Sequence, residues 1–188
     1  MTSTLSEFQI IKRYFESVGE SDPQLVHLGI GDDCAVVDIP ASQSLCFSLD
    51  TMVEGRHFPV DAAPDKVAFR ALAASLSDLA AMGAKPSFFT LSLTLPSANE
   101  TWLAGFSSGL KSLARRHSVK LLGGDTTKGP LTIGIQVHGL VPVGGALLRS
   151  GAKIGDILAV TGTLGDAGAA LDLLSKASPT DREAYLLD

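Results

Sequence analysis

Aspartates placed near the ends of expected secondary structure elements are the residues of this chain that could do chemistry. Gly-Asp-Asp and Gly-Gly-Asp are ordinary turn sequences when each is taken singly. Asp50, at the end of an expected strand, could serve only as a hydrogen-bonding group. Asp78 differs, because it interrupts an apolar helical surface, where an ionised carboxylate is costly unless something pairs with it. The four sequences that carry these residues are Gly31-Asp32-Asp33, Ser48-Leu49-Asp50-Thr51, Leu76-Ser77-Asp78-Leu79 and Gly123-Gly124-Asp125.

Taken together, these aspartates predict a binding site for divalent cations. If they converge in one cleft, each close pair of carboxylates repels by roughly 4 kcal/mol at a separation of about 4 Å. The ligands on offer are all oxygens, without a histidine or cysteine set, which favours Mg²⁺ over zinc. Mg²⁺ held by carboxylates usually completes its shell with water and phosphate oxygens, so phosphoryl transfer is the favoured chemistry. In that chemistry the protein positions and neutralises, so we expect no catalytic nucleophile.

The familiar phosphate-binding motifs are missing. The sequence has no GxxxxGK[ST] motif, which counts against a P-loop fold. Gly162, Gly165 and Gly168 form a loose GxxGxxG pattern, but its spacing is wrong for a dinucleotide-binding fingerprint. This pattern is more typical of a plain helix start.

Composition narrows the class of protein. The 188 residues are 45% hydrophobic and 19% charged, as in soluble globular proteins, and the net charge of -5 argues against nucleic-acid binding. No apolar stretch reaches the length of a membrane span, and the charged N-terminus is not a secretory signal, so we expect a cytoplasmic protein without a membrane partner. Cys34 and Cys46 lie in apolar strand-like runs and are interpreted as small buried hydrophobic residues.

Hydrophobic periodicity predicts a mixed order of helices and strands. Because the two types do not alternate strictly, we expect an α+β domain of ferredoxin-like type, with a mostly antiparallel sheet and helices on one face. Residues 1–150 are predicted to form this domain, and residues 151–188 to begin a second, α/β domain. The expected helices are 5–17, 64–83, 99–116 and 165–174; the expected strands are 35–39, 45–49, 89–95, 119–122, 131–141 and 157–161, with a loop at 123–130.

Five motifs occur in an order that resembles bacterial thiamine-monophosphate kinase, a relative of aminoimidazole ribonucleotide synthetase and selenophosphate synthetase. The resemblance covers essentially the whole chain. The motifs are Gly29-Ile30-Gly31-Asp32-Asp33-Cys34-Ala35, Asp50-Thr51 with Glu54-Gly55-Arg56-His57-Phe58, Leu76 to Ala84, Gly123-Gly124-Asp125-Thr126-Thr127, and Arg149-Ser150-Gly151-Ala152-Lys153.

The resemblance implies direct transfer of the ATP γ-phosphate to thiamine monophosphate, giving thiamine diphosphate. It also implies a homodimer formed by joining sheets, with ATP and several magnesium ions in the resulting cleft. Gly124, Asp125 and Arg149 would contact ATP, and His57 would touch the thiamine substrate. Without the resemblance, Arg149 would be interpreted as a solvated loop base and His57 as a surface or capping residue. The implied magnesium ligands are Asp33, Ser48, Leu49, Asp50, Asp78 and Asp125.

Two departures from the family pattern stand out. Leu49 occupies a position that usually carries a hydroxyl residue, so it could bind metal only through its backbone carbonyl. The Ser-Asp-Gly and Gly-Gly-Glu-Asp motifs of the family's second domain are also missing from this sequence. We therefore expect this chain to be the N-terminal part of the enzyme, able to dimerise and to bind Mg-nucleotide weakly but with little turnover. The alternatives are a superfamily member with another small-molecule acceptor, and a non-catalytic dimerisation or binding module.

Overall fold

The computed structural model describes residues 5–20 and 22–176. The chain divides into two compact units, Met1–Leu148 and Arg149–Asp188. Within the described residues, no helix is long and apolar enough to cross a membrane.

A four-stranded sheet forms the centre of the first unit. Its strands are β3 (Gln43–Val53), β4 (Lys85–Leu95), β5 (Lys120–Lys128) and β6 (Thr132–Pro142), arranged in the order β3-β6-β4-β5. Strand β6 is antiparallel to both β3 and β4, whereas β4 and β5 are parallel. The expected α+β class is therefore confirmed, and β3 and β5 are the two edges of this sheet.

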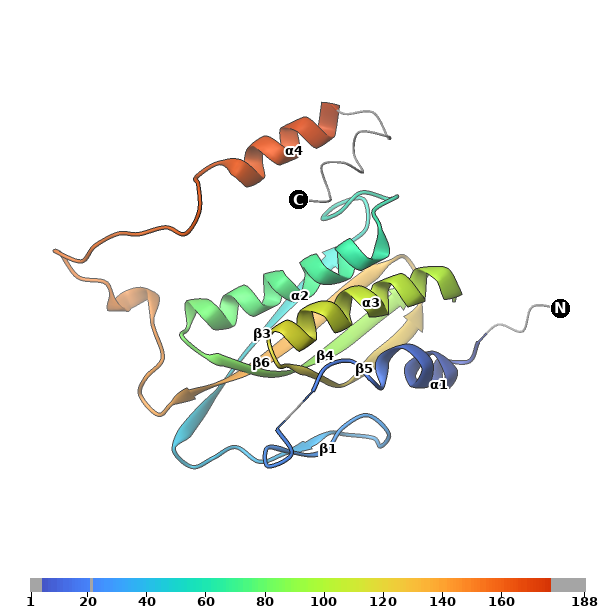
Figure 1. The fold of residues 1–188 in the computed structure, drawn as a ribbon, viewed down its shortest axis with the longest axis horizontal. Helices are drawn as coiled ribbons and strands as arrows, with labels where there is room; N and C mark the ends of the chain where they lie inside the picture. Colours follow the sequence, from blue (N-terminus) through green and yellow to red (C-terminus); the bar gives the residue numbers. More distant parts are fainter. Residues whose placement is uncertain (1–4, 21, 177–188) are drawn as a thin grey trace. The chain divides into compact units, whose positions relative to one another are not determined.

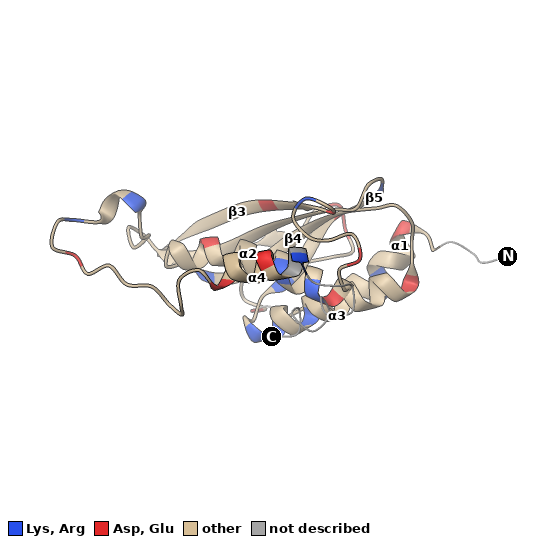
Figure 2. Ribbon diagram, turned by 90° about the horizontal axis from the view of Figure 1, so that it is seen from above, with Lys and Arg blue, Asp and Glu red and all other residues tan. Residues whose placement is uncertain are grey.

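Two long helices cover one face of the sheet, α2 (Pro64–Ala81) and α3 (Glu100–Arg116) (Figure 1). Seen along the sheet, strands and helices form two layers (Figure 2). Successive side chains of a strand point to opposite faces, so Phe89, Leu91 and Leu93 enter the core beneath the helices. Ile133 and Ile135 of β6 join them. The hydroxyl residues that alternate with these positions in β4 face the other side.

Glycines let the two helices approach closely. A Cβ atom on Gly109 would lie 2.1 Å from the Asp65 carbonyl oxygen, and one on Gly105 would lie 2.7 Å from Pro64 Cγ. The start of α2 therefore packs directly on the backbone of α3. This contact fixes the direction of α2, whose last turns carry Asp78.

The N-terminal segment packs beside α3, but it is not the single helix predicted over residues 5–17. It consists of α1 (Glu7–Ile10), which Ser6 and Gln9 cap reciprocally, followed by the π-helical turn η1 (Ile11–Phe15). Tertiary contacts fix this wider turn: the Phe15 ring meets Phe106 edge-on at 6.4 Å, and the Ser107 hydroxyl donates to the Tyr14 carbonyl.

The face of the sheet away from α2 and α3 is only partly covered, and we call it the open face. A small sheet of β1 (Val26–Leu28) and β2 (Val36–Val37) lies on this side (Figure 1). The strand predicted at 35–39 thus exists only as β2, and its partner β1 was not predicted. Beneath it, Leu25, Phe88 and Leu122 form a small second core.

Two further predictions differ from the structure. Residues 123–130 were expected to be a loop, yet β5 continues to Lys128, because hydrogen bonding to β4 holds the Gly-Gly-Asp-Thr-Thr sequence extended. The strand predicted at 157–161 is wrong, since these residues have no regular structure. A strand needs a partner, and the described part of the second unit holds only η2 (Arg149–Gly151) and α4 (Asp166–Lys176).

Candidate functional site

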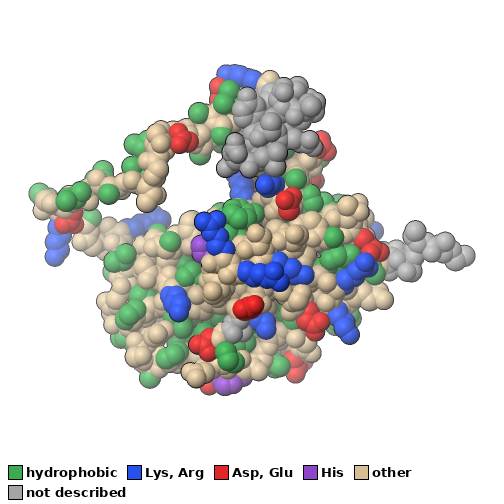
Figure 3. Space-filling view, in the orientation of Figure 1, with side chains coloured by type: hydrophobic (Ala, Val, Ile, Leu, Met, Phe, Trp, Pro, Cys, Tyr) green, Lys and Arg blue, Asp and Glu red, His purple; other side chains and the backbone are tan. Residues whose placement is uncertain are grey.

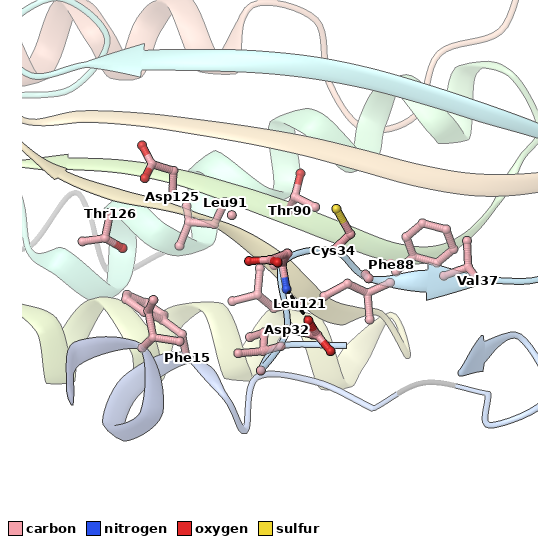
Figure 4. Close-up of a pocket in the computed structure, with 18 of the residues that line it drawn as sticks. Phe15, Asp32, Cys34, Val37, Phe88, Thr90, Leu91, Leu121, Asp125 and Thr126 are labelled. Atoms are coloured by element: carbon pink, nitrogen blue, oxygen red, sulfur yellow. Dashed lines mark hydrogen bonds between the residues drawn. The ribbon is translucent and has the colours of Figure 1, made fainter. Parts of the chain in front are cut away.

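A pocket of about 690 Å³ lies at the β5 edge of the sheet. Asp33, Gly124 and Asp125 line it together with further polar residues such as Thr90 and Thr126 and with apolar side chains. Figure 4 shows Asp125, Thr90 and Cys34 along one side of this pocket and Phe15 and Leu121 along the other. The Gly-Asp-Asp and Gly-Gly-Asp motifs, about 90 residues apart in the sequence, therefore meet in one pocket.

The loop that carries Asp33 is held by its neighbours. Gly31 has a φ of 131°, which favours glycine. The Asp32 carboxylate accepts the backbone N–H of Asp33 at 2.8 Å. Asp32 thus stabilises the turn, while the exposed Asp33 side chain lines the pocket.

Gly124 lets β5 run directly against β4. Its φ is 150°, and a Cβ atom there would lie 1.8 Å from the Leu91 carbonyl oxygen. Asp125, the next residue, pairs with Ser92 of β4 and is exposed. The glycine therefore determines where the Asp125 carboxylate lies.

A second polar group lies at the β3 edge. The Ser48 hydroxyl donates to Asp78 Oδ2 at 2.5 Å, joining the middle of β3 to the last turns of α2. Asp50 lies two residues further along β3 and therefore on the same face as Ser48. Asp78 itself is exposed, so the prediction that it lies on a packed apolar surface is wrong. Leu49 points to the open face, where its side chain is 61% exposed, so only its backbone is available to a metal on the helix side.

These two groups lie at opposite edges of the sheet. Neighbouring strands are about 4.8 Å apart, so three strand spacings separate β3 from β5 by about 14 Å. Within the described residues, no three His, Cys, Asp or Glu side chains come close enough to hold a metal ion. The convergence of Asp33, Asp50, Asp78 and Asp125 in one cleft is therefore wrong for a single chain. The sequence contained no information on strand order, which places β6 and β4 between the two groups.

The two remaining predicted site residues have different surroundings. His57 is exposed, and its Nδ1 accepts the backbone N–H of Val53 at 3.0 Å, so a neutral ring carries its proton on Nε2. The ring closes the turn after β3, and its contact with substrate stays a prediction. Arg149 begins the second unit in η2, and its role in ATP binding also stays a prediction.

Some residues that line the pocket were not anticipated. Cys34 was expected to be buried, yet it is exposed and lines the pocket, because the turn at Asp32 and Asp33 carries it out of the β2 strand. His138 stacks on Phe88 at 4.9 Å, and its Nδ1 is buried without a hydrogen-bond partner. Burial lowers the pKa of His138, which favours the neutral ring. In the sequence, only the alternation of apolar and other residues along β6 could have indicated that His138 points to the open face.

Comparison with known proteins identifies the family. The model described as AIR synthase related protein, N-terminal domain, matches residues 31–141. The chain belongs to this family. The matched residues include the Gly-Asp-Asp loop, the two edge strands β3 and β5, and the two long helices α2 and α3.

The relatives to which this chain is most readily compared are named thiamine-monophosphate kinases. It is 53% identical over 168 residues to the thiamine-monophosphate kinase of Escherichia coli strain K12, covering 89% of this chain and 51% of the relative. The crystal structure of thiamine-monophosphate kinase from Stenotrophomonas maltophilia K279a is 39% identical, with a TM-score of 0.79 over 98% of this chain and 60% of that one. The structure described as AaThiL complexed with AMPPCP and TMP is 31% identical, with a TM-score of 0.70, over 84% and 52%. The resemblance inferred from the five motifs is confirmed, and the chain spans about half the length of the curated relatives it matches.

Proposed function

We propose that this chain forms the ATP- and magnesium-binding part of a thiamine-monophosphate kinase, which transfers the γ-phosphate of ATP to thiamine monophosphate and yields thiamine diphosphate. The observation that carries the proposal is the pocket in which Asp33, Gly124 and Asp125 meet. The relative that contains AMPPCP, an ATP analogue, together with TMP supports the choice of substrates. On the face shown in Figure 3, acidic and basic side chains are interspersed, a pattern that differs from the basic stripe of nucleic-acid-binding proteins. The expected cytoplasmic location stays a prediction.

The donor atoms in both groups fit magnesium. Asp33 and Asp125 offer carboxylates at the β5 edge, and Asp50 and Asp78 do so at the β3 edge, where Ser48 adds a hydroxyl. Carboxylate and hydroxyl oxygens with room for water are the ligands that Mg²⁺ prefers. When bound, the metal neutralises the triphosphate and aligns the transferred phosphoryl group. The chain's own part is to hold these oxygens in place and to admit the phosphates beside Gly123, where a Cβ atom would meet nothing within 4 Å.

We further propose that two copies of the chain join into a dimer through their open faces. Three apolar residues of β3 point to this face and are exposed in the single chain: Leu45, Phe47 and Leu49. Both sheet edges also lack a strand partner over most of their length within the described residues. Exposed apolar faces and unpaired edges favour association, and two four-stranded sheets can close into an eight-stranded barrel without free edges.

The dimer would also complete the metal site. A two-fold axis parallel to the strands places β3 of one protomer beside β5 of the partner, twice per dimer. The Asp50 and Asp78 carboxylates of one protomer would then lie near the pocket that contains Asp33 and Asp125 of the partner. This arrangement explains why one chain holds two incomplete groups at opposite edges of its sheet.

Replacing Phe47 by aspartate is expected to dissociate the dimer. The Phe47 side chain is 66% exposed, so the change costs little in the folding of one chain, yet it places a charge in the apolar interface. We expect dimer affinity to fall by roughly 100-fold or more, measured by sedimentation velocity. Phe69→Asp, on the partly exposed surface of α2, is the matched control and should leave the dimer intact. Equal behaviour of the two variants would contradict an interface on the open face.

Calorimetry with AMPPCP tests the proposed function itself. We expect the 188-residue chain to bind AMPPCP in the presence of magnesium and to lose at least about tenfold in affinity after chelation, because the carboxylates then repel the triphosphate. Binding that is unaffected by magnesium would contradict the proposal. On the complete protein, ADP release with thiamine monophosphate compared with other acceptors identifies the substrate.

A further inference from the structure

The C-terminal end of α2 closes with a glycine turn. Met82 is the C-cap residue, and Gly83 follows with a φ of 68°. The N–H of Gly83 donates to the Ala80 carbonyl at 3.0 Å, and that of Ala84 donates to the Leu79 carbonyl at 2.9 Å. This pair of hydrogen bonds is the Schellman arrangement, which satisfies carbonyl groups that have no partner within the helix.

The segment that follows β6 is bound to this helix end (Figure 1). The Leu147 N–H donates to the Met82 carbonyl at 3.0 Å and so supplies a partner for another carbonyl of the helix end. The Leu147 side chain covers Gly83, because a Cβ atom added to this glycine would lie 3.2 Å from Leu147 Cδ1. Ala146, the preceding residue, packs against the core. Leu147 therefore holds the helix end through its backbone and through its side chain.

Met82 connects this anchor with Asp78. The Met82 N–H donates to the Asp78 carbonyl at 3.2 Å, while the Met82 carbonyl accepts the Leu147 N–H. The Asp78 carboxylate in turn accepts the Ser48 hydroxyl of β3. The position of this carboxylate thus depends on the same helical turn that Leu147 holds. Because the groups that orient a metal ligand also affect its affinity for the metal, a displaced turn would weaken metal binding.

We infer that Leu147 is a positioning residue for Asp78 and thereby strengthens magnesium binding at the β3 edge. The inference rests on the proposed function, which assigns Asp78 to the metal site. The Leu147 side chain is 61% exposed and carries no atom that binds metal, so it acts through the helix end that it covers. The second unit begins at Arg149, two residues after Leu147. The helix end that carries Asp78 is thus joined to the start of the second unit by a short stretch of chain.

A magnesium titration distinguishes positioning from nucleotide contact. Leu147→Ala is expected to raise the magnesium concentration for half-maximal AMPPCP binding by about 3- to 10-fold, and to change the AMPPCP affinity at saturating magnesium by less than about twofold. Leu147→Met keeps an apolar cover and should retain the wild-type magnesium dependence. Leu148→Ala is the matched control, because Leu148 is equally exposed (60%) but has no atom within 4 Å of a Cβ at Gly83. Calorimetry on the 188-residue chain measures both quantities.

A second background tests whether Leu147 acts through Asp78. In an Asp78→Asn variant, titrated at higher magnesium concentrations, Leu147→Ala is expected to have no further effect, because the group that it positions is gone. An equal effect in both backgrounds would overturn the inference, as would weaker AMPPCP binding at every magnesium concentration or an unchanged magnesium dependence of Leu147→Ala. These three results leave the proposed function intact. If the unmodified chain shows no magnesium-dependent binding of AMPPCP, the proposed function and this inference both fail.

Discussion

Two variants that each fail to bind nucleotide are expected to regain about a quarter of the wild-type sites when they are refolded together. One variant carries Asp33→Asn and Asp125→Asn, and the other carries Asp50→Asn and Asp78→Asn. Each change removes a charge while keeping the side-chain shape, so each variant alone should lose magnesium-dependent AMPPCP binding by roughly 100-fold or more. Random pairing makes half of the dimers mixed, and one of the two sites in each mixed dimer is intact. The binding stoichiometry from calorimetry measures the recovery.

A matched mixture makes this result specific to a shared site. In this mixture, an Asp33→Asn variant is refolded with an Asp125→Asn variant, so both changes lie in the group at the β5 edge. Every site in a mixed dimer then still lacks one carboxylate. We expect no recovery in this control. If the first mixture also fails to recover, the two groups do not meet across the interface in the proposed way, and the β3 edge does not lie beside the partner's β5 edge.

Gly124→Ala is expected to destabilise the first unit by more than about 3 kcal/mol. The new methyl group would lie 1.8 Å from the Leu91 carbonyl oxygen, and this backbone oxygen cannot move away without breaking the β4–β5 pairing. The left-handed φ of 150° adds strain. For a chain of this length, such a loss lowers the melting temperature by roughly 6–12 °C. Thermal unfolding followed by circular dichroism measures the shift.

The adjacent glycine provides the control. A Cβ atom on Gly123 would meet nothing within 4 Å. Gly123→Ala is therefore expected to change stability by less than about 1 kcal/mol. Similar melting temperatures for the two variants would show that the β4–β5 contact at Gly124 relaxes easily, and the close approach would then not determine the position of Asp125.

Much of the fold was predictable because its signals are local. The alternation in β4 and the apolar stripes of α2 and α3 lie within single segments, and capping residues such as Asn99 mark where helices begin. The length of β5 was not predictable, since Gly-Gly-Asp-Thr-Thr is typical of a turn and becomes a strand only through its pairing with β4. The π-helical turn at Ile11–Phe15 likewise depends on contacts with α3, far away in the sequence.

The candidate site was predictable in composition but not in arrangement. Residue type and spacing identified Asp33 and Asp125, which share a pocket, and Asp78, whose hydrogen-bond partner Ser48 was implied only by the family resemblance. Strand order decides which of these pairs meet, and no single segment encodes it. The exposure of Asp78 also depends on what packs around its helix, so the sequence pattern alone assigned this side chain to an apolar surface.

The pairing of β3 with β6 determines when this unit can be completed during synthesis. Gln43 pairs with Pro142, so the first strand of the main sheet has no neighbour until the last one has left the ribosome. Closing so long a loop is slow compared with forming α2, α3 and the β4–β5 pair, whose contacts are closer in sequence. Ser48 and Asp50 therefore reach their final positions late. In a nascent chain that ends before Thr132, only the acidic residues at the β5 edge can be in place.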